Sequence, residues 1–241
     1  MVSDLLRERF RLKETIVTIT AQEQDQIEAA KEEIAFQRAL LEQFIREDPF
    51  FMLTLEPYDC PIDEAPRIVG EMARAGSIVG IGPMSAVAGT IAKFALEAMI
   101  GAGATCAIVD NGGDVAIACD RAVLIGIYAG PSPLRNTALE IPPRASPLGI
   151  CTSSGTVGPS LSFGSADAAV VVSEDVSLAD AAATALGNAV GDSSPLAESF
   201  EVVDRPEIAG ALVIRGEEMA LWGELPPLRR ANLRPDLITR G

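Results

Sequence analysis

Two apolar runs enclose a cluster of turn-forming residues in the segment ATCAIVDNGGDVAIA, residues 104–118. This pattern predicts a β-hairpin with its turn at Asn111–Asp114. A hairpin commits its two strands to antiparallel pairing, which favours an α+β fold over a parallel α/β sheet. The turn holds one glycine more than a simple hairpin needs. The alternative is therefore that Gly112 and Gly113 let a ligand approach the backbone closely.

Helix and strand patterns alternate along the rest of the chain. Gln24–Glu47 is predicted to be a long amphipathic helix, because Ile27, Ile34 and Leu41 recur every seven residues. Strands are expected at 13–20, 50–55, 122–129 and 166–173, a closing hairpin at 211–222, and shorter helices at 68–75 and 178–190. We expect one domain over residues 1–241, with antiparallel-rich sheets packed against helices. The long helix lies either on its outside or against a second copy in a homo-oligomer.

A second helix is predicted within Gly80–Gly103. Pro83 occupies the position of a first helical residue, while Gly101 and Gly103 stand where a helix ends. Its face is built from small residues, so another element is expected to pack closely on it. The backbone amides at its start, around Pro83, Met84 and Ser85, suit an anion. The alternative is a tight turn leading into the helix.

Charge and residue content exclude several classes of function. The net charge of −15 leaves no basic stripe for nucleic acid and argues against docking on an anionic membrane. The chain has no histidine, which excludes a Ser-His-Asp triad, a Cys-His dyad and any histidine-containing metal site. No signal peptide or lipidation motif is recognisable at the N-terminus, and a reducing cytoplasm is the expected compartment.

The four cysteines are Cys60, Cys106, Cys119 and Cys151, and none forms a CxxC motif. Cys106 and Cys119 lie in apolar runs and are predicted to be reduced core thiols. No cysteine is expected to be catalytic, because a reactive thiolate needs a neighbouring base or cation and no histidine is present.

Two polar patterns suggest a binding site. Asp180, Thr184 and Asn188 recur at helical spacing on one side of an Ala-rich helix, which suits a hard cation held by Asp180 and Thr184. The alternative is a capping box formed by Ser177 and Asp180. The uncharged Ser/Thr/Gly run from Thr152 to Ser165 begins with the donor-rich residues Thr152, Ser153, Ser154 and Gly155. These suit phosphate oxygens or form a satisfied hairpin loop.

Four motifs in one order resemble the FAD:protein FMN transferases of the ApbE type. They are Ser85-Ala-Val-Ala-Gly-Thr90, Asp110-Asn-Gly-Gly-Asp114, Cys151-Thr-Ser-Ser-Gly155 and Ala179-Asp-Ala-Ala-Ala-Thr184. Each motif is weak alone, but their shared order over residues 80–190 is more specific. The wording GPMSAVAG, NGGD and CTSSGTVG resembles an uncharacterised ApbE-like family still more closely.

The resemblance implies an ApbE-like, T-fold-related domain made of two related halves. It implies that Asp180 and Thr184 hold Mg²⁺ beside the diphosphate of FAD or a related nucleotide. The pocket would be lined by Pro83, Met84, Ser85, Asn111, Gly112, Gly113, Thr152, Ser153, Ser154 and Gly155. The lysine of the transferases falls on Gly89, and their histidine-bearing segment has no counterpart. Two functions therefore stay open: metal-dependent flavin or nucleotide chemistry, or a binding or structural protein that kept the fold alone.

Overall fold

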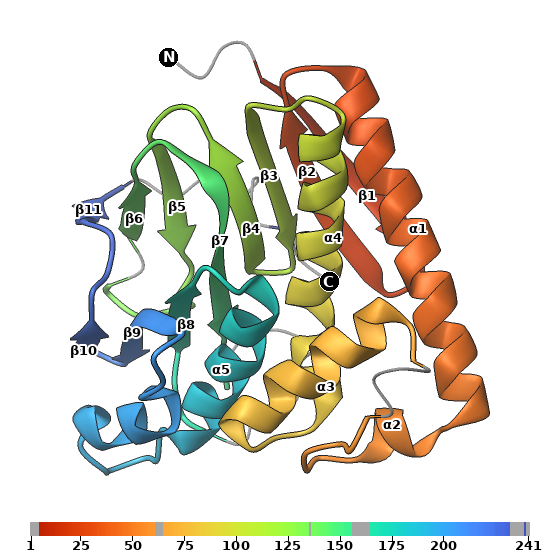
Figure 1. The fold of residues 1–241 in the computed structure, drawn as a ribbon. Helices are drawn as coiled ribbons and strands as arrows, with labels where there is room; N and C mark the ends of the chain where they lie inside the picture. The colour runs from red at the N-terminus through yellow and green to blue at the C-terminus, as the bar shows by residue number, and fades with distance from the viewer. Residues whose placement is uncertain (1–4, 61–64, 135, 156–163, 232–238, 240–241) are drawn as a thin grey trace.

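An eight-stranded antiparallel sheet forms the centre of the computed structural model, which describes residues 5–60, 65–134, 136–155, 164–231 and 239 (Figure 1). Its strands run in the order β1-β2-β3-β4-β7-β8-β9-β10. Their bounds are β1 Leu6–Leu12, β2 Thr15–Ala21, β3 Cys106–Asn111, β4 Asp114–Cys119, β7 Arg144–Ser153, β8 Ala168–Ser173, β9 Ile208–Arg215 and β10 Glu218–Gly223. The predicted α+β class with antiparallel-rich sheets is confirmed.

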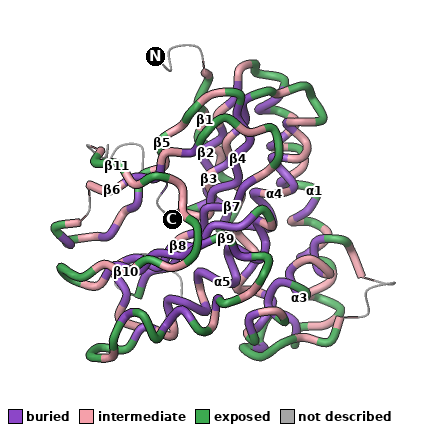
Figure 2. The backbone as a smooth tube through the Cα atoms, turned by 60° about the vertical axis from the view of Figure 1, so that its left-hand side comes forward, coloured by how far each residue is buried: buried purple, intermediate pink, exposed green. Residues whose placement is uncertain are grey.

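Helices cover one face of this sheet, and a small second sheet lies against part of the other (Figure 1). The helices are α1 Gln24–Glu47, α2 Phe50–Leu53, α3 Arg67–Val79, η1 Pro83–Ala86, α4 Val87–Gly101, α5 Val176–Ala189 and η2 Leu196–Val203. The small sheet contains β5 Val123–Ile127, β6 Thr137–Ile141 and β11 Leu228–Arg230. Buried residues concentrate in the main sheet and in α4 and α5 (Figure 2).

The order of elements repeats one unit, in which a strand pair is followed by helix and by a second strand pair. The first unit runs from β1–β2 through the helices α1 to α4 to β3–β4. The second runs from β7–β8 through α5 to β9–β10. The two units join through the pairing of β4 with β7, which places the end of the β3–β4 hairpin beside the end of β7.

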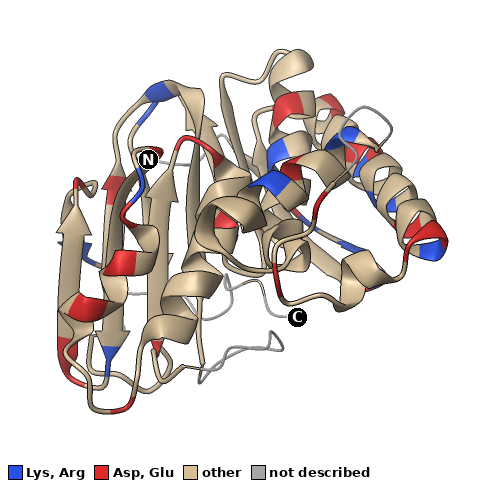
Figure 3. Cartoon of the chain, turned by 60° about the horizontal axis from the view of Figure 1, so that its bottom comes forward, with Lys and Arg blue, Asp and Glu red and all other residues tan. Residues whose placement is uncertain are grey.

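The seven-residue pattern of α1 is confirmed by its packing. Ile27 and Ile34 are fully buried and Leu41 nearly so, and the helix contacts α4 and the strands β1 and β2. Its outer side carries interspersed acidic and basic residues (Figure 3). Ion pairs such as Lys31–Glu8 are partly exposed and add little stability. The apolar face therefore holds the helix in place.

The helix α4 is apolar and packs inside the fold. By length and composition alone, Pro83–Gly101 would suffice to cross a membrane, and half of that stretch is buried inside the fold. It packs between α1, α5 and the strands β3 and β4, which accounts for its apolar sequence. Pro83 begins the short 3₁₀ turn η1 that leads into α4, and Gly101 is its last residue, as predicted.

Residues 50–55 do not form the predicted strand, because Phe50–Leu53 is the single-turn helix α2. Phe51 is fully buried, and its ring packs edge-on against Phe44 at 5.3 Å and Tyr58 at 5.0 Å. One aromatic anchor thus holds the turn while Phe50 and Leu53 stay exposed. An apolar run of this length fits a strand or a buried helical turn equally well, so periodicity could not separate them.

The prediction of reduced thiols at Cys106 and Cys119 is wrong, although both residues are buried as expected. The register of β3 and β4 places them directly opposite each other, and they form a disulfide. Thirteen positions separate them in the sequence. Sequence spacing alone carries no information on such a pairing until the hairpin register is known.

Candidate functional site

The predicted hairpin turn at the end of β3 and β4 is confirmed. Asn111 pairs with Asp114, so Gly112 and Gly113 are the two central residues, with φ of 71° and 109°. A two-residue turn with positive φ at both centres matches the twist of the flanking strands and strongly prefers glycine. The turn geometry therefore accounts for both glycines, and no ligand is needed to explain them.

The hairpin register sends the two flanking aspartates to opposite faces of the sheet. Asp114 shares the helix-covered face with Asn111, whose side-chain amide donates to the Ala88 carbonyl oxygen at 3.0 Å. Asp110 points to the other face. There it accepts hydrogen bonds from the Gly113 amide at 3.0 Å and the Thr239 hydroxyl at 2.7 Å.

Asp180 of α5 reaches across to the start of the neighbouring helix α4. Its Oδ2 accepts the Gly89 N–H at 2.7 Å, and the Ala88 N–H also donates to this carboxyl. The alternative interpretation of Asp180, a capping box with Ser177, is wrong. The cap of α5 is Asp175, whose side chain accepts from the Leu178 amide at 3.3 Å. The anion at the positive end of α4 is therefore a carboxylate of the protein itself.

Gly89 lies directly against Asp180. A Cβ atom at this position would stand 2.6 Å from the Asp180 Cβ and 2.9 Å from the Val176 carbonyl oxygen. Distances below 3.0 Å require one partner to move. Because the transferase lysine falls on this residue, the close approach of α4 and α5 in this chain leaves no room for that lysine.

The carboxyls of Asp180 and Asp114 face each other and are hydrogen-bonded. Burial raises the pKa of Asp180 to about 7, against the opposing effect of the two amides of α4. Burial and the nearby Asp180 charge raise the pKa of Asp114 well above its ordinary range. Within the described residues, neither carboxyl forms an ion pair with a lysine or arginine. The two carboxyls therefore repel each other when both are ionised, and a bound proton or cation would relieve that repulsion.

Cys151 lies on β7 opposite Asp114, and its thiol is within hydrogen-bonding reach of that carboxyl. Burial and the two neighbouring carboxylates raise the pKa of the Cys151 thiol well above its ordinary value. A thiol held protonated in this way is a poor nucleophile. Its environment therefore agrees with the expectation that no cysteine is catalytic.

The end of β7 carries the first part of the donor-rich run. Thr152 and Ser153 are the last strand residues, paired with β8, and the Thr152 N–H donates to Asp114. Ser153 and Ser154 are buried, while Gly155 is exposed and its N–H donates to the Ala166 carbonyl at 2.9 Å. Residues 156–163 of the run lie outside the described part of the chain. The structure brings Thr152 beside Asp114 and the glycine turn.

The segment around Pro83 contributes less than the sequence suggested. Pro83 is buried, and Met84 packs against the helix-side core. The Ser85 hydroxyl turns back and donates to the Gly82 carbonyl oxygen at 2.6 Å. The segment lies at the start of α4 as expected, but the first free amides of that helix already meet Asp180.

Thr184 lies one helical turn beyond Asp180 on α5 and is half-buried. Asp180, Asp114 and Thr184 offer only oxygen atoms, the donor type that Mg²⁺ and Mn²⁺ prefer. Asp180 is buried and Asp114 is partly exposed, and a divalent cation would neutralise such a carboxyl pair without a basic partner. By the chemistry of its donors, this group of residues fits a hard divalent cation.

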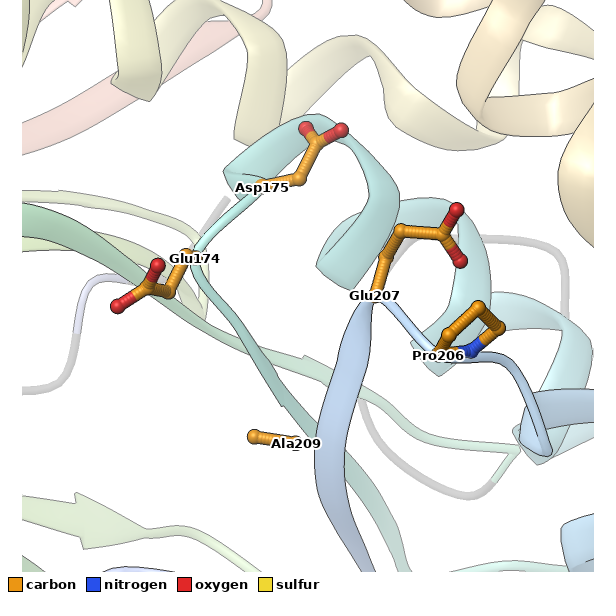
Figure 4. A pocket seen from close by; sticks show the side chains of 5 residues that line it. All are labelled: Glu174, Asp175, Pro206, Glu207 and Ala209. Atoms are coloured by element: carbon orange, nitrogen blue, oxygen red, sulfur yellow. The ribbon is translucent and has the colours of Figure 1, made fainter.

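A separate cavity of about 440 Å³ opens at the start of α5 (Figure 4). It is lined by Glu174, Asp175, Pro206, Glu207 and Ala209. Two of its carboxylates are already used, since Asp175 pairs with Arg74 and Glu174 with Arg144. None of the predicted site residues lines this cavity.

Asp114 was not among the predicted site residues, although it belongs to the predicted motif Asp110-Asn-Gly-Gly-Asp114. In a two-residue hairpin turn the two flanking residues share a face, so accepting Asn111 should have included Asp114. The roles of Gly89 and Cys151 had no comparable signal. Both follow from contacts with α5, which lies far along the chain.

A family model described as AbpE bacteria matches residues 2–202. A UPF0280 protein of Methanothrix thermoacetophila is 59% identical over 237 residues, covering 98% of this chain and 100% of that protein. One from Methanosarcina acetivorans is 57% identical over 237 residues, covering 98% and 93%. The resemblance predicted from the four motifs is confirmed.

Solved structures show the same fold at low sequence identity. The apo form of the flavinyl transferase ApbE from Pseudomonas stutzeri aligns with a TM-score of 0.56 at 12% identity, covering 90% of this chain and 93% of that one. The ApbE protein of Thermotoga maritima aligns with a TM-score of 0.54 at 14% identity, covering 98% and 100%. This likeness extends to the fold alone.

Proposed function

This chain belongs to the family described as AbpE bacteria, and from that premise we propose that it binds a flavin or related nucleotide diphosphate through a divalent cation. Asp180 and Thr184 hold the cation, and the phosphate oxygens complete its coordination. When bound, the cation neutralises the diphosphate and links it to the protein. The structural neighbour from Pseudomonas stutzeri is a flavinyl transferase, which is why a flavin is the first ligand to test.

One observation carries this proposal: Asp180 is buried against a second carboxyl without a basic partner among the described residues. A protein of net charge −15 gains little by placing a second carboxyl against a buried one. A bound Mg²⁺ would supply the missing positive charge and would attract an anionic ligand to the site. Thr152, beside this pair, and the following Ser153 and Ser154 supply hydroxyls for polar groups of the ligand.

A second function, binding without group transfer, is favoured by Gly89. The lysine of the transferases has no room at this position, and the chain contains no histidine. Cys151 is a buried, protonated thiol and offers no substitute nucleophile. Transfer chemistry therefore lacks its usual cationic and basic groups, whereas binding needs only the cation and the pocket.

The test is a thermal-shift panel with FAD, FMN, ADP and ATP, each with and without Mg²⁺. A specific ligand raises the melting temperature by mass action, and we expect the shift to require the metal. Asp180→Asn keeps an acceptor for the Gly89 amide but removes the charge, so it should abolish the metal-dependent shift. A wild-type protein that no member of the panel stabilises with Mg²⁺ contradicts the proposal.

Transfer is tested separately by incubating the protein with FAD and a panel of candidate acceptor proteins, then looking for covalent flavin fluorescence on a denaturing gel. Binding without labelling supports the second function. Labelling that is lost in Asp180→Asn contradicts the second function and shows that the bound flavin is also transferred. Light scattering measures the oligomeric state, and we expect a homo-oligomer in which the long helix α1 contacts a second copy.

A further inference from the structure

We infer that Asp114 is a second protein carboxylate for the divalent cation, so that the cation sits between the β3–β4 hairpin and α5. This inference rests on the proposed function and adds a residue to its site. Asp180 and Thr184 alone would place the ion on one helix. Asp114 instead ties it to the central sheet, 66 residues earlier in the chain by the numbering of the two aspartates.

The first argument concerns the groups that are hydrogen-bonded to the Asp180 carboxyl. The start of α4 engages this carboxyl through the Gly89 N–H, at 2.7 Å from Oδ2, and through the Ala88 N–H. The same carboxyl is also hydrogen-bonded to Asp114. A cation that approaches Asp180 from the side away from α4 therefore meets Asp114 as well.

The second argument is the rigidity of Asp114. It is the first residue of β4, directly after a turn whose two glycines adopt the conformation the hairpin requires. It pairs with Asn111 across the turn and with Cys151 on β7. The Thr152 N–H donates to its carboxyl. Its position is therefore preset, which lowers the cost of ordering a ligand residue when the cation binds.

The third argument concerns the class of metal. Cys151 lies beside Asp114, and a thiolate would shift the preference towards softer ions such as Zn²⁺. However, the only trio of acidic or cysteine ligand atoms within 4.8 Å of one another in the described chain is Cys106, Cys119 and Asp120. Cys151 therefore does not close on both carboxyls. The donors that do meet are oxygens, which selects Mg²⁺ or Mn²⁺.

The experiment measures Mn²⁺ alone, without nucleotide, by electron paramagnetic resonance of the free ion and by calorimetry at pH 8. Four proteins are compared: wild type, Asp114→Asn, Asp180→Asn and Asp110→Asn. We expect Asp114→Asn to weaken Mn²⁺ binding by at least about tenfold, because a charged ligand becomes a neutral one. Asp110→Asn is the matched control: the same substitution on the same hairpin, facing the other side of the sheet. It should stay within about twofold.

Two further variants keep the test decisive. Asp114→Ser removes the carboxylate with a smaller side chain and serves if Asp114→Asn does not fold, as judged by circular dichroism. Cys151→Ala leaves both carboxyls in place and should bind Mn²⁺ like wild type. A tenfold loss in Cys151→Ala would assign the ion to the thiol and overturn the inference.

The outcomes separate this inference from the proposed function. If Asp180→Asn loses Mn²⁺ while Asp114→Asn and Asp114→Ser bind like wild type, Asp114 is not a ligand and the proposed function stands. If wild type takes up no Mn²⁺, both ideas fail. If Asp110→Asn loses as much affinity as Asp114→Asn, the loss reflects the hairpin and the inference fails.

Discussion

Asp110 and Asp114 flank the same two-glycine turn, yet their surroundings differ completely. Asp110 accepts hydrogen bonds from the Gly113 amide and the Thr239 hydroxyl. The Thr239 hydroxyl is in turn hydrogen-bonded to the Thr18 hydroxyl at 2.8 Å. Asp114 meets the carboxyl of Asp180. Both aspartates accept hydrogen bonds within the chain, Asp114 from the Thr152 N–H and the Cys151 thiol, but only Asp114 also faces the carboxyl of Asp180. This second carboxyl is the reason why we propose a ligand on the Asp114 face of the hairpin and none on the Asp110 face.

The difference teaches where to look for a ligand in a fold of this kind. Burial raises the pKa of Asp110 as well, but the Thr239 and Gly113 donors and the nearby Arg7 oppose that rise. A buried acid pair without a basic partner destabilises the folded state until a proton or cation arrives. Four experiments test this contrast between the Asp110 face and the Asp114 face.

The largest expected effect is a fall in stability with rising pH on the Asp114 face. The folded pKa of Asp180 is raised from 3.8 to about 7, so the folded protein binds the proton more tightly than the unfolded chain does. Its contribution is fully present below about pH 4 and is lost as pH rises through about 7, by roughly 4 kcal/mol at most. Urea unfolding of metal-free wild type and Asp180→Asn at pH 5 and pH 8 measures it. Equal changes in the two proteins would contradict the assignment.

The next effect is steric and also lies on the Asp114 face. Gly89→Ala should cost about 3 kcal/mol of unfolding free energy, since its Cβ would lie 2.6 Å from the Asp180 Cβ. It should also weaken Mn²⁺ binding by moving Asp180. Gly101→Ala, at the other end of α4, is the control, because its added Cβ meets no atom within 4 Å. If both variants are equally stable, α4 and α5 do not pack as closely as described.

A third test uses the far end of the hairpin. Reduction of the Cys106–Cys119 disulfide should cost about 2–3 kcal/mol, because the bond closes a short loop in the unfolded chain. Mn²⁺ affinity should stay unchanged, since the disulfide lies at the end of β3–β4 away from the turn. Denaturation with and without dithiothreitol measures the first quantity. The double variant Cys106→Ala/Cys119→Ala should be insensitive to the reductant, and a sensitive double variant would point to another cause.

The smallest effect is expected on the Asp110 face. Thr239→Val removes one hydroxyl donor from the partly buried carboxyl of Asp110 and should cost about 1 kcal/mol. Metal affinity should not change, because this side of the sheet does not face α5. A double-mutant cycle with Asp110→Ala isolates the pair. If Thr239→Val costs as much in the Asp110→Ala background as in wild type, the hydrogen bond does not stabilise the fold.

Elements with a local sequence signal were predicted correctly. The seven-residue repeat of Ile27, Ile34 and Leu41 predicted α1 with its observed bounds, and Asn-Gly-Gly-Asp predicted the β3–β4 turn. The order of four motifs indicated the family. Each of these rests on periodicity or turn chemistry within a short window, which the chain carries wherever it folds.

Side-chain contacts between distant elements could be identified only in the folded structure. Asp180 satisfies local capping rules on paper, but in the fold it accepts from Gly89, 91 residues earlier. Cys106 and Cys119 became a disulfide, and Asp114 became the partner of Asp180, once strand register and helix packing were set. The physical reason is that local sequence determines which face of a helix or hairpin carries a given side chain. The residue that this side chain contacts belongs to the element packed against that face, and that element comes from a distant part of the chain.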